Sequence, residues 1–409
     1  MLYIGRVHID MNFLFLSHRF PKGDRNTCLE KDFIKKLIEK GHNVYVATPT
    51  ERRMKEETHL YQEEGAKILY VKTGNRTKEY NLIEKICTIL STPFLLNKGI
   101  KRYFKDIHVD YIVSYTPFMS NLNLIKLLTN YYSCKNILFL WDIMPQTAKD
   151  MGIIKNNLIF NYMKNKEKKL YQCVDKIICN CDEAKNYILK NNYKREQDII
   201  FIRNPEYIQI EDLKNLNLRE KYGYTQKEKV FIFGGNMGML QKLDNLLDLA
   251  KNMINDKEVK FLLIGDGKDK FSLEKRIEKE KITNVKILNV VPREEYENLV
   301  SEMNAGLICL SEKNTVPNFP TKVTAYLKLG LPMFAILDKA AAKGIGKYID
   351  DNQIGIWSKA GELEETTLKF KEFLKNIESN KYSKEYLKSI YEKDFDIEKA
   401  YETFIKEIE

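Results

Sequence analysis

The loop that begins near residue 318 carries the residue types with the most evident chemical use. Thr321 and Lys322 stand between apolar runs at Ala305–Leu310 and Met333–Leu337, with a short helical pattern after the lysine. A strand, a loop, a helix and a strand make one parallel α/β step. The loop brings a hydroxyl, an ammonium and free backbone N–H groups to a helix start, where an anion is favoured by roughly 0.3–1 kcal/mol. These residues predict a phosphate or diphosphate site, with a solvated lysine in a turn as the alternative.

A glycine-rich turn at 233–241 is a second candidate for contact with a diphosphate. Glycines between a strand and a helix let the backbone approach a phosphate closely, although such turns also use glycine for steric reasons alone. The turn does not have the spacing G-x-G-x-x-G, and no acidic residue ends the next apolar run, Phe261–Ile264. A dinucleotide oxidoreductase is therefore disfavoured. The turn Gly265-Asp266-Gly267 is open to the same two interpretations.

Asp142 is the candidate catalytic carboxylate of the first half of the chain. It follows the apolar run Asn136–Leu140, so its side chain is expected at the carboxyl end of a strand. There it could orient or deprotonate a hydroxyl group of a substrate. A cap on a turn or helix is the equally good alternative.

Alternating strands and helices must position these groups. The pattern repeats as a strand–helix series, breaks around Phe201–Pro205 and restarts at Val230. It predicts an α/β protein with two doubly wound, Rossmann-like parallel sheets that face each other across a cleft. The expected units are 11–205, 206–382 and a helical, highly charged tail at 383–409. The expected strands are 13–17, 43–48, 111–114, 136–140, 176–180, 230–235, 261–264, 285–288, 306–310 and 333–336.

Length and composition agree with a two-domain globular protein. The chain has 409 residues, of which 44% are hydrophobic, enough for two cores. No run approaches the roughly 20 apolar residues of a membrane span, and no signal sequence is evident, so we expect a cytoplasmic protein. The seven cysteines are scattered and all five histidines precede residue 110, which does not match a zinc spacing. The single D-x-D, Asp394-Phe395-Asp396, lies in the charged tail, and we expect no metal requirement.

The positive charge is concentrated in the first half. Residues 1–205 hold 34 Lys+Arg against 22 Asp+Glu, whereas the remainder holds 33 against 35. Since no nucleic-acid motif accompanies the excess, it indicates an anionic membrane surface or an anionic lipid-linked substrate. A generic lysine-rich surface is the alternative. The segment Ile86–Phe104 mixes apolar and basic residues, so it could lie on a membrane or, more commonly, pack on its own sheet.

Several of these motifs, in this order, resemble glycosyltransferase family 4 across nearly the whole chain. The resemblance rests on residues 234–241, 264–267 and 291–295, and on the Pro-Thr-Lys…Gly-Leu-Pro stretch at 320–332. Trp-Asp-Ile-Met-Pro-Gln-Thr at 141–147, with Met-Gly-Ile at 151–153, resembles the branch that builds capsule and O-antigen units. The resemblance implies a GT-B fold, a nucleotide-activated sugar donor and retention of anomeric configuration.

The chain departs from this family at defined positions. Ala325 stands where the family usually has a glutamate that binds the nucleotide ribose, and the other glutamate of the pair would fall near Pro317. Asn236 and Gln241 replace the usual arginine and lysine of the diphosphate site, and Trp141 replaces a histidine. The pattern at 322–327 also resembles a bacterial galactofuranosyl- and glucosyltransferase group that lacks the glutamate.

The resemblance assigns candidate roles to individual residues. Lys322 would stabilise the charge that develops on the leaving diphosphate, and Asp142 would act at the acceptor hydroxyl. The expected donor site comprises Gly235, Asn236, Met237, Gly238, Gln241, Asp266, Thr321, Lys322 and Thr324. The expected acceptor site comprises His18, Phe20, Lys22, Gly23 and Trp141. The nucleotide-sugar is a substrate, so no cofactor is expected.

The resulting hypothesis is a retaining glycosyltransferase of hexosyl or N-acetylhexosaminyl type. It would move a sugar from a UDP-sugar to a lipid-linked saccharide during surface polysaccharide synthesis, at the inner face of the cell membrane. A GT-B sugar-nucleotide epimerase or hydrolase would turn over the donor without an acceptor. A non-catalytic partner of another transferase is the alternative from a different class, and the missing glutamates favour it.

Overall fold

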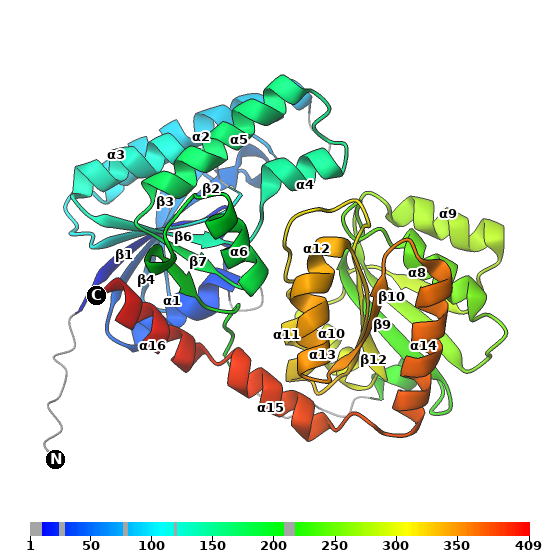
Figure 1. The fold of residues 1–409 in the computed structure, drawn as a ribbon. Helices are drawn as coiled ribbons and strands as arrows, with labels where there is room; N and C mark the ends of the chain where they lie inside the picture. The colour runs from blue at the N-terminus through cyan, green and yellow to red at the C-terminus, as the bar shows by residue number, and fades with distance from the viewer. Residues whose placement is uncertain (1–9, 24–28, 77–80, 118–120, 208–216) are drawn as a thin grey trace, which may run out of the picture.

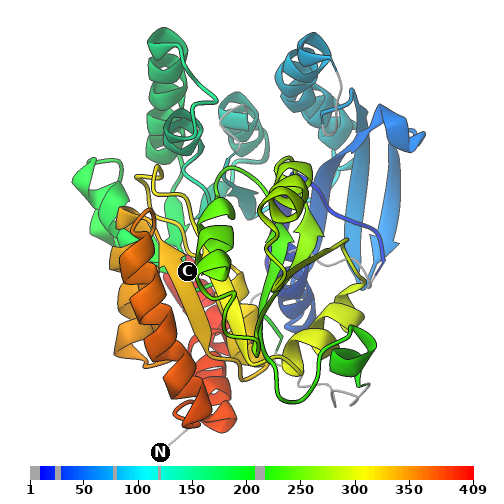
Figure 2. The same cartoon turned by 90° about the vertical axis from the view of Figure 1, so that its right-hand side faces the viewer.

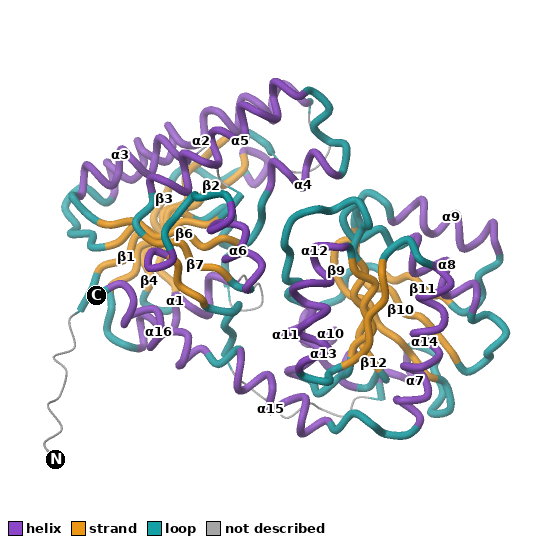
Figure 3. Tube along the Cα trace, viewed as in Figure 1, coloured by secondary structure: helices purple, strands orange, loops and turns teal. Residues whose placement is uncertain are grey.

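Two α/β domains make up the protein, each a sheet covered by helices on both faces (Figures 1 and 3). The computed structural model describes residues 10–23, 29–76, 81–117, 121–207 and 217–409. The predicted fold class, two Rossmann-like domains, is confirmed. Across this described part, none of the helices combines the length and the apolar run needed to cross a bilayer.

The first domain is built on an eight-stranded sheet with the order β3-β4-β2-β1-β5-β6-β7-β8. Its strands are β1 (Asn12–Leu16), β2 (Asn43–Glu51), β3 (His59–Glu63), β4 (Ala66–Thr73), β5 (Tyr111–Tyr115), β6 (Lys135–Leu140), β7 (Lys176–Cys179) and β8 (Ile199–Phe201). All neighbours are parallel except β3 and β4, which form an antiparallel edge hairpin. Neither strand of this hairpin was predicted, and a wholly parallel sheet was therefore the wrong expectation for this edge.

The central strand of this sheet is buried on both faces. Phe13 and Phe15 of β1 point into one core, and Leu14 and Leu16 point into the other, because successive side chains of a strand alternate between faces. The helices and short turns of the domain are α1 (Leu29–Glu39), a 3-10 turn (Arg52–Met54), α2 (Leu82–Tyr103), α3 (Leu122–Tyr132), α4 (Met144–Asp150), α5 (Asn157–Cys173), α6 (Asp182–Lys190) and a 3-10 turn (Glu196–Asp198).

Helix α2 is the amphipathic segment that could have lain on a membrane. Leu96, Ile100 and the following Phe104 are buried in the core, and Leu95 and Tyr103 pack against it. The commoner interpretation, a helix that packs on its own sheet, is confirmed for this face of the helix.

The second domain has a six-stranded, wholly parallel sheet with the order β11-β10-β9-β12-β13-β14. Its strands are β9 (Lys229–Asn236), β10 (Val259–Asp266), β11 (Val285–Leu288), β12 (Ala305–Cys309), β13 (Met333–Leu337) and β14 (Gly355–Lys359). Five of the six match predicted strands, and β14 was missed. Its helices are α7 (Leu218–Lys221), α8 (Asp244–Asn252), α9 (Lys270–Glu280), α10 (Arg293–Ser301), α11 (Lys322–Lys328), α12 (Lys339–Ala341), a π turn (Ala342–Gly346), α13 (Lys347–Asp351) and α14 (Leu363–Glu378).

The last segment forms two helices, α15 (Lys384–Asp394) and α16 (Ile397–Ile408), rather than one. Helix α15 packs on α11 of the second domain, and α16 packs on α1 of the first. The ring of Phe404 is fully buried between Phe33 and Phe13. A buried hydrogen bond of 2.8 Å joins His42 to the hydroxyl of Tyr401. The first core is therefore completed by residues from the far end of the chain.

Candidate active site

Lys322 is the first residue of α11, directly after the loop that leaves β12. Its Nζ lies 4.7 Å from the centre of the Phe233 ring. Burial lowers the pKa of this lysine to about 8, and among the described residues no carboxylate acts on it. A crowded ammonium without a counter-charge is costly unless an anion joins it. The surroundings of Lys322 thus suit the phosphate site predicted from the sequence, and that site stays a prediction.

Gly235 leaves the space beside this ammonium open. Its φ of +134° is a conformation that side chains disfavour, and a Cβ there would lie 3.2 Å from Nζ and 3.3 Å from Cε of Lys322. The residue is exposed, so a ligand bound over Lys322 can reach its backbone. The geometry favours the functional interpretation of this glycine.

Close packing explains why glycine occupies the neighbouring positions. Strands β9 and β10 end side by side, with Gly265 opposite Gly235. A Cβ on Gly265 would collide with the carbonyl of Gly235, and one on Gly267 would collide with the carbonyl of Met237. A Cβ on Gly234 would collide with the hydroxyl of Tyr296. The two glycine turns are thus packed against each other, which settles the ambiguity of the second turn in favour of packing.

The other expected donor residues divide into accessible and buried ones. Asn236 is exposed and donates a long hydrogen bond of 3.5 Å to Gln241. Asp266 is also exposed, and its carboxylate accepts from the N–H of Gly267 at 2.8 Å. Thr321 is exposed and its side chain makes no cap bond to α11. All of these can meet a ligand.

Met237, Gly238 and Thr324 are placed differently. The side chain of Met237 is fully buried in the second-domain core, and that of Thr324 is fully buried within α11. Gly238 is buried as well. The side chains of Met237 and Thr324 therefore do not reach an open site, whereas the approach of the backbone at 235–238 to a donor stays a prediction. Apolar periodicity in 234–241 and 322–327 would have indicated that both side chains are buried.

Asp142 follows β6 in the first domain, and its backbone is held by one hydroxyl. Thr116 accepts hydrogen bonds from the N–H of Trp141 at 2.9 Å and of Asp142 at 2.8 Å. The carboxylate of Asp142 is accessible, and the loss of hydration in its surroundings raises its pKa. A fixed backbone and a raised carboxyl pKa suit a group that accepts a hydrogen bond or a proton from a hydroxyl.

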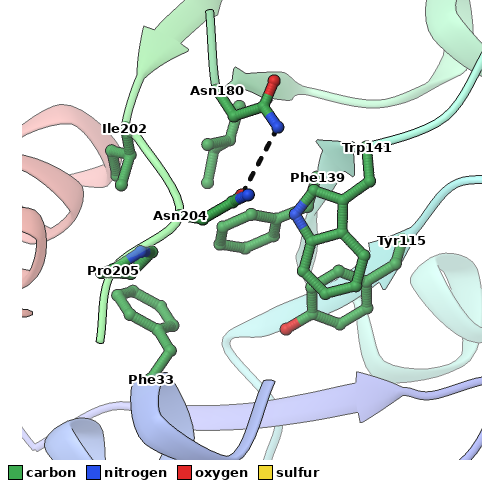
Figure 4. A pocket seen from close by; sticks show the side chains of 9 residues that line it. Phe33, Tyr115, Phe139, Trp141, Asn180, Ile202, Asn204 and Pro205 are labelled. Carbon is green, nitrogen blue, oxygen red and sulfur yellow. Dashed lines mark hydrogen bonds between the residues drawn. The ribbon is translucent and has the colours of Figure 1, made fainter. Parts of the chain in front are cut away.

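Trp141 belongs to a small pocket at the carboxyl ends of β5 to β8 (Figure 4). Its ring lies 4.3 Å, centre to centre, from that of Tyr115. On the opposite side, Asn180 donates a hydrogen bond of 3.4 Å to Asn204. The cavity volume is only about 10 Å³, roughly the space of one water molecule, so the pocket cannot enclose a sugar ring. The half-exposed ring of Trp141 can still offer an apolar surface to a sugar outside it. Tyr115 and both asparagines were not predicted from the sequence.

The loop after β1 contributes less than expected. His18 is near the site, and burial together with Arg76 lowers the pKa of its imidazole to about 3, so the ring is neutral at pH 7. The backbone carbonyl of His18 accepts from Arg76 at 3.2 Å. The ring of Phe20 is buried in the first core, so it cannot contact an acceptor, contrary to the expectation.

Lys22 and Gly23 are engaged with the edge hairpin. The ammonium of Lys22 donates to Glu56 at 2.8 Å, and the N–H of Gly23 donates to Glu63 at 3.2 Å. Both partners belong to the segment around β3, which was not predicted as a strand. Their assignment to the acceptor site stays a prediction, and Asp24 of the same loop lies outside the described residues.

The D-x-D motif has structural roles. Asp394 accepts from the hydroxyl of Tyr348 at 2.6 Å, and Asp396 caps α16 by accepting from the N–H of Glu398 at 2.8 Å. Both carboxylates of the motif thus stabilise the last two helices, and the expectation that no metal is needed stays a prediction.

One contact shows that the two halves of the site face each other. The carboxylate of Asp150, at the end of α4, accepts from the N–H of Thr315 at 2.8 Å and from its hydroxyl at 2.6 Å. Thr315 lies in the loop that leads to Lys322, and α4 begins two residues after Asp142. The cationic loop of the second domain is thus tied to the element that follows the catalytic candidate of the first.

Comparison with known proteins identifies the domain that holds Lys322. Residues 215–389 match the family model of Glycosyl transferases group 1. The matched residues span the second domain. The chain is also 23% identical over 228 residues to the Probable glycosyltransferase WbjE of Pseudomonas aeruginosa, covering 54% of this chain and 55% of that protein. The match therefore spans about half the length of that relative.

The family model covers the second domain alone, whereas solved structures are similar to nearly the whole chain. Sucrose-phosphate synthase from Thermosynechococcus elongatus has a TM-score of 0.75 at 11% identity, with 97% of this chain and 98% of that chain covered. HepE of Anabaena, in complex with UDP and glucose, has a TM-score of 0.68 at 14% identity, with 97% and 99% covered. At this identity the likeness shows the two-domain GT-B fold and nothing finer.

Proposed function

We propose that this chain is a retaining glycosyltransferase that moves a sugar from a UDP-sugar to a lipid-linked saccharide. One observation carries the proposal: a crowded ammonium at Lys322, without a carboxylate partner among the described residues, faces an open glycine in a group 1 glycosyltransferase domain. The leaving group of such a reaction is a nucleoside diphosphate, whose charge grows as the glycosidic bond breaks. A cation fixed at that place stabilises the transition state more than the ground state.

The donor would lie along the ends of β9 and β10. Lys322 and the hydroxyl of Thr321 would bind the diphosphate, and the backbone at Gly235 would approach it. Asn236 and Gln241, both polar and neutral, would contact the sugar or the phosphates by hydrogen bonds. UDP is proposed as the nucleotide because the similarly folded HepE was crystallised with it. The transferred group would be a hexose or an N-acetylhexosamine.

The acceptor would meet the first domain at Asp142 and the pocket of Trp141. Asp142 would orient the attacking hydroxyl, and the half-exposed ring of Trp141 would contact the sugar that carries it. In a retaining reaction with same-face attack, the leaving phosphate takes the acceptor proton, so no separate base is required. Lys322 supplies the positive charge beside the diphosphate, and we propose that the reaction needs neither a metal nor another cofactor.

The proposed acceptor is a saccharide on a polyprenyl diphosphate, on the way to a capsule or O-antigen polysaccharide. The excess of Lys+Arg over Asp+Glu in residues 1–205, 34 against 22, supports an anionic, membrane-borne acceptor. The protein would then work in the cytoplasm, at the inner face of the cell membrane.

A thermal-shift panel with UDP, GDP, ADP, CMP and their sugars tests the donor part. A ligand at about 100 times its dissociation constant adds roughly 2.7 kcal/mol of stability, and we expect this with UDP and one UDP-sugar. Transfer of labelled sugar to lipid extract, with and without EDTA, tests the reaction. Sensitivity to EDTA would contradict the metal-free mechanism, and a shift with no nucleotide would contradict the donor site.

A second candidate is a non-catalytic partner that stabilises another transferase. Ala325 favours it, because the family's ribose-binding glutamate is absent there. Absence of every nucleotide shift, together with co-purification of an active transferase, would establish this alternative.

A further inference from the structure

Helix α2 has a second apolar face that points away from the core. Ile83, Ile86, Leu90 and Phe94 recur at helical spacing, and all four are exposed. Leu90 is 72% and Phe94 is 68% accessible. The core-facing side chains lie on the opposite side of the helix, so packing within the domain does not explain this set. Large exposed apolar sets of this kind mark interaction surfaces.

Helix α5 begins with a similar set. Leu158, Ile159 and Tyr162 are exposed in its first two turns, and Ile153 is exposed in the turn before it. Both helices stand above the sheet of the first domain in two perpendicular views, α5 in green and α2 in blue (Figures 1 and 2). Both begin on the side that faces the second domain. The two apolar ends are therefore presented in the same direction, at two separate points.

The charges beside these ends are almost all positive. The exposed face of α2 continues from Phe94 to Lys98, Lys101 and Arg102, and Glu84 is the only acidic residue of the helix. Among the described residues, no carboxylate is within ion-pair distance of these three cations; Lys101 instead lies 4.8 Å from the ring of Tyr131 on α3.

Helix α5 repeats this charge pattern. It carries Lys164, Lys166, Lys168 and Lys169 against one acidic residue, Glu167. Of these lysines, Lys164 alone pairs with a carboxylate in the part of the chain that the structure describes, and that carboxylate is the buried Glu167. On both helices the exposed apolar residues are thus followed along the chain by cations, and among the described residues only Lys164 of these has a carboxylate partner.

We infer that the exposed faces of α2 and α5 form a docking surface for an anionic lipid bilayer. The two separate apolar ends suit insertion at two points into a continuous surface, and cations beside exposed apolar side chains are the pattern that binds anionic headgroups. The inference rests on the membrane association proposed above and names the surface that mediates it. Docking there would bring a lipid-linked acceptor to the side of the first domain that holds Asp142.

Co-sedimentation of the full chain with vesicles tests this surface without any donor or acceptor. We expect binding to phosphatidylcholine vesicles that contain about 30% phosphatidylglycerol and little binding to phosphatidylcholine alone. Leu90→Gln/Phe94→Gln should weaken the partition at least about tenfold, because two exposed apolar side chains lose their burial in lipid. The matched control is Phe271→Gln/Leu368→Gln, two apolar residues of the second domain that are 66% and 70% accessible.

A second pair of variants tests the charges. Lys98→Gln/Arg102→Gln should weaken binding about fivefold per cation removed, whereas Lys257→Gln/Lys275→Gln on the second domain should not. All of these side chains are exposed, and thermal denaturation confirms that each variant is folded.

Three outcomes would overturn the inference. The first is binding to neutral vesicles that equals binding to anionic ones. The second is vesicle binding by the α2 variants that equals binding by their second-domain controls. The third is a wild-type chain that binds no vesicle but self-associates, with the self-association lost in the α2 variants. The last would make the surface a protein interface. None of these outcomes bears on the nucleotide shift or on transfer to a soluble acceptor, so the docking surface and the proposed reaction fail separately.

Discussion

Within the described part of the chain, both domains have cations without a carboxylate partner, but the surroundings of these cations differ. In the second domain Lys322 is a single crowded ammonium over the Phe233 ring, while other cations there, such as Arg276, are paired with acids. On α2 of the first domain, Lys98 and Arg102 are exposed beside apolar side chains. A buried cation favours a compact anion at one distance and is weakly screened, whereas exposed cations attract diffuse charge and are screened by salt. Positive charge would thus select a compact anion at Lys322 and attract an extended anionic surface at α2.

The largest expected effect comes from removing the positive charge of Lys322. Lys322→Met keeps most of the side-chain volume and leaves the leaving diphosphate without its positive partner. We expect turnover to fall about 100-fold or more, as for other groups that stabilise developing charge, measured as UDP released with lipid acceptor present. Lys275→Met, an exposed lysine of α9, is the control. Turnover of Lys322→Met within about twofold of wild type would show that the lysine is not part of the site.

Ionic strength should affect vesicle binding by the α2 cations more than nucleotide binding at Lys322. Raising ionic strength from about 0.05 M to 0.5 M shortens the screening length from roughly 14 Å to 4 Å. Binding to anionic vesicles should weaken more than tenfold, and the dissociation constant of UDP should change less than about threefold. Equal salt sensitivity of both measurements would remove the distinction between the two regions.

The affinity for UDP should also depend on pH, because the pKa of Lys322 in the free protein is about 8. The protonated form binds the diphosphate, so affinity is full below pH 7 and falls as the pH rises through 8. Between pH 7 and 9 the loss should be about tenfold, measured by calorimetry. Lys322→Arg keeps its charge throughout this range, and its affinity, though weaker, should be flat. A pH profile shared by both proteins would place the titration elsewhere.

The smallest expected effect concerns a buried acid of the first domain. Glu30 is fully buried, and burial raises the pKa of its carboxyl from 4.5 to about 8. The folded protein therefore keeps a proton that the unfolded chain releases, so stability is lost as the pH rises from about 5 to 8. Glu30→Gln removes this loss of stability. The difference in Tm between the variant and the wild type should therefore shift in favour of the variant by at least about 2 °C when the pH is raised from 5 to 8. The exposed Glu364→Gln should show no such trend.

Most of the fold could be predicted because its strands are buried on both faces. Runs such as Phe13–Leu16 and Phe261–Ile264 are continuously apolar, and these were located to within a few residues. Strand β3 was missed because it is an edge strand whose Tyr61 and Gln62 are exposed, so it lacks an apolar run. Strand β4 was missed although Ile68–Val71 is a continuous buried apolar run. Strand β14 was missed for the same reason as β3, since its first three residues are only half-buried.

Individual residues of the candidate site could be predicted where the local sequence identifies them. Lys322 and Gly235 could be identified from their own loops, whereas their mutual proximity required the parallel sheet to be assembled. Asn180 and Asn204 are separated by 24 positions and come from the ends of different strands, so no local pattern joins them. On α2, apolar residues on all sides hid the difference between the core face and the exposed face.

The first domain depends on residues that follow the second domain in the sequence. Phe404 of α16 fills the core between Phe13 and Phe33, and the hydroxyl of Tyr111 donates to the carbonyl of Ile408 at 2.8 Å. During translation the strands of the first sheet leave the ribosome long before this helix exists, while the second domain has all of its strands by residue 359. Although an amino-terminal domain generally folds first during synthesis, the first core here lacks the Phe404 side chain until the second domain has been translated.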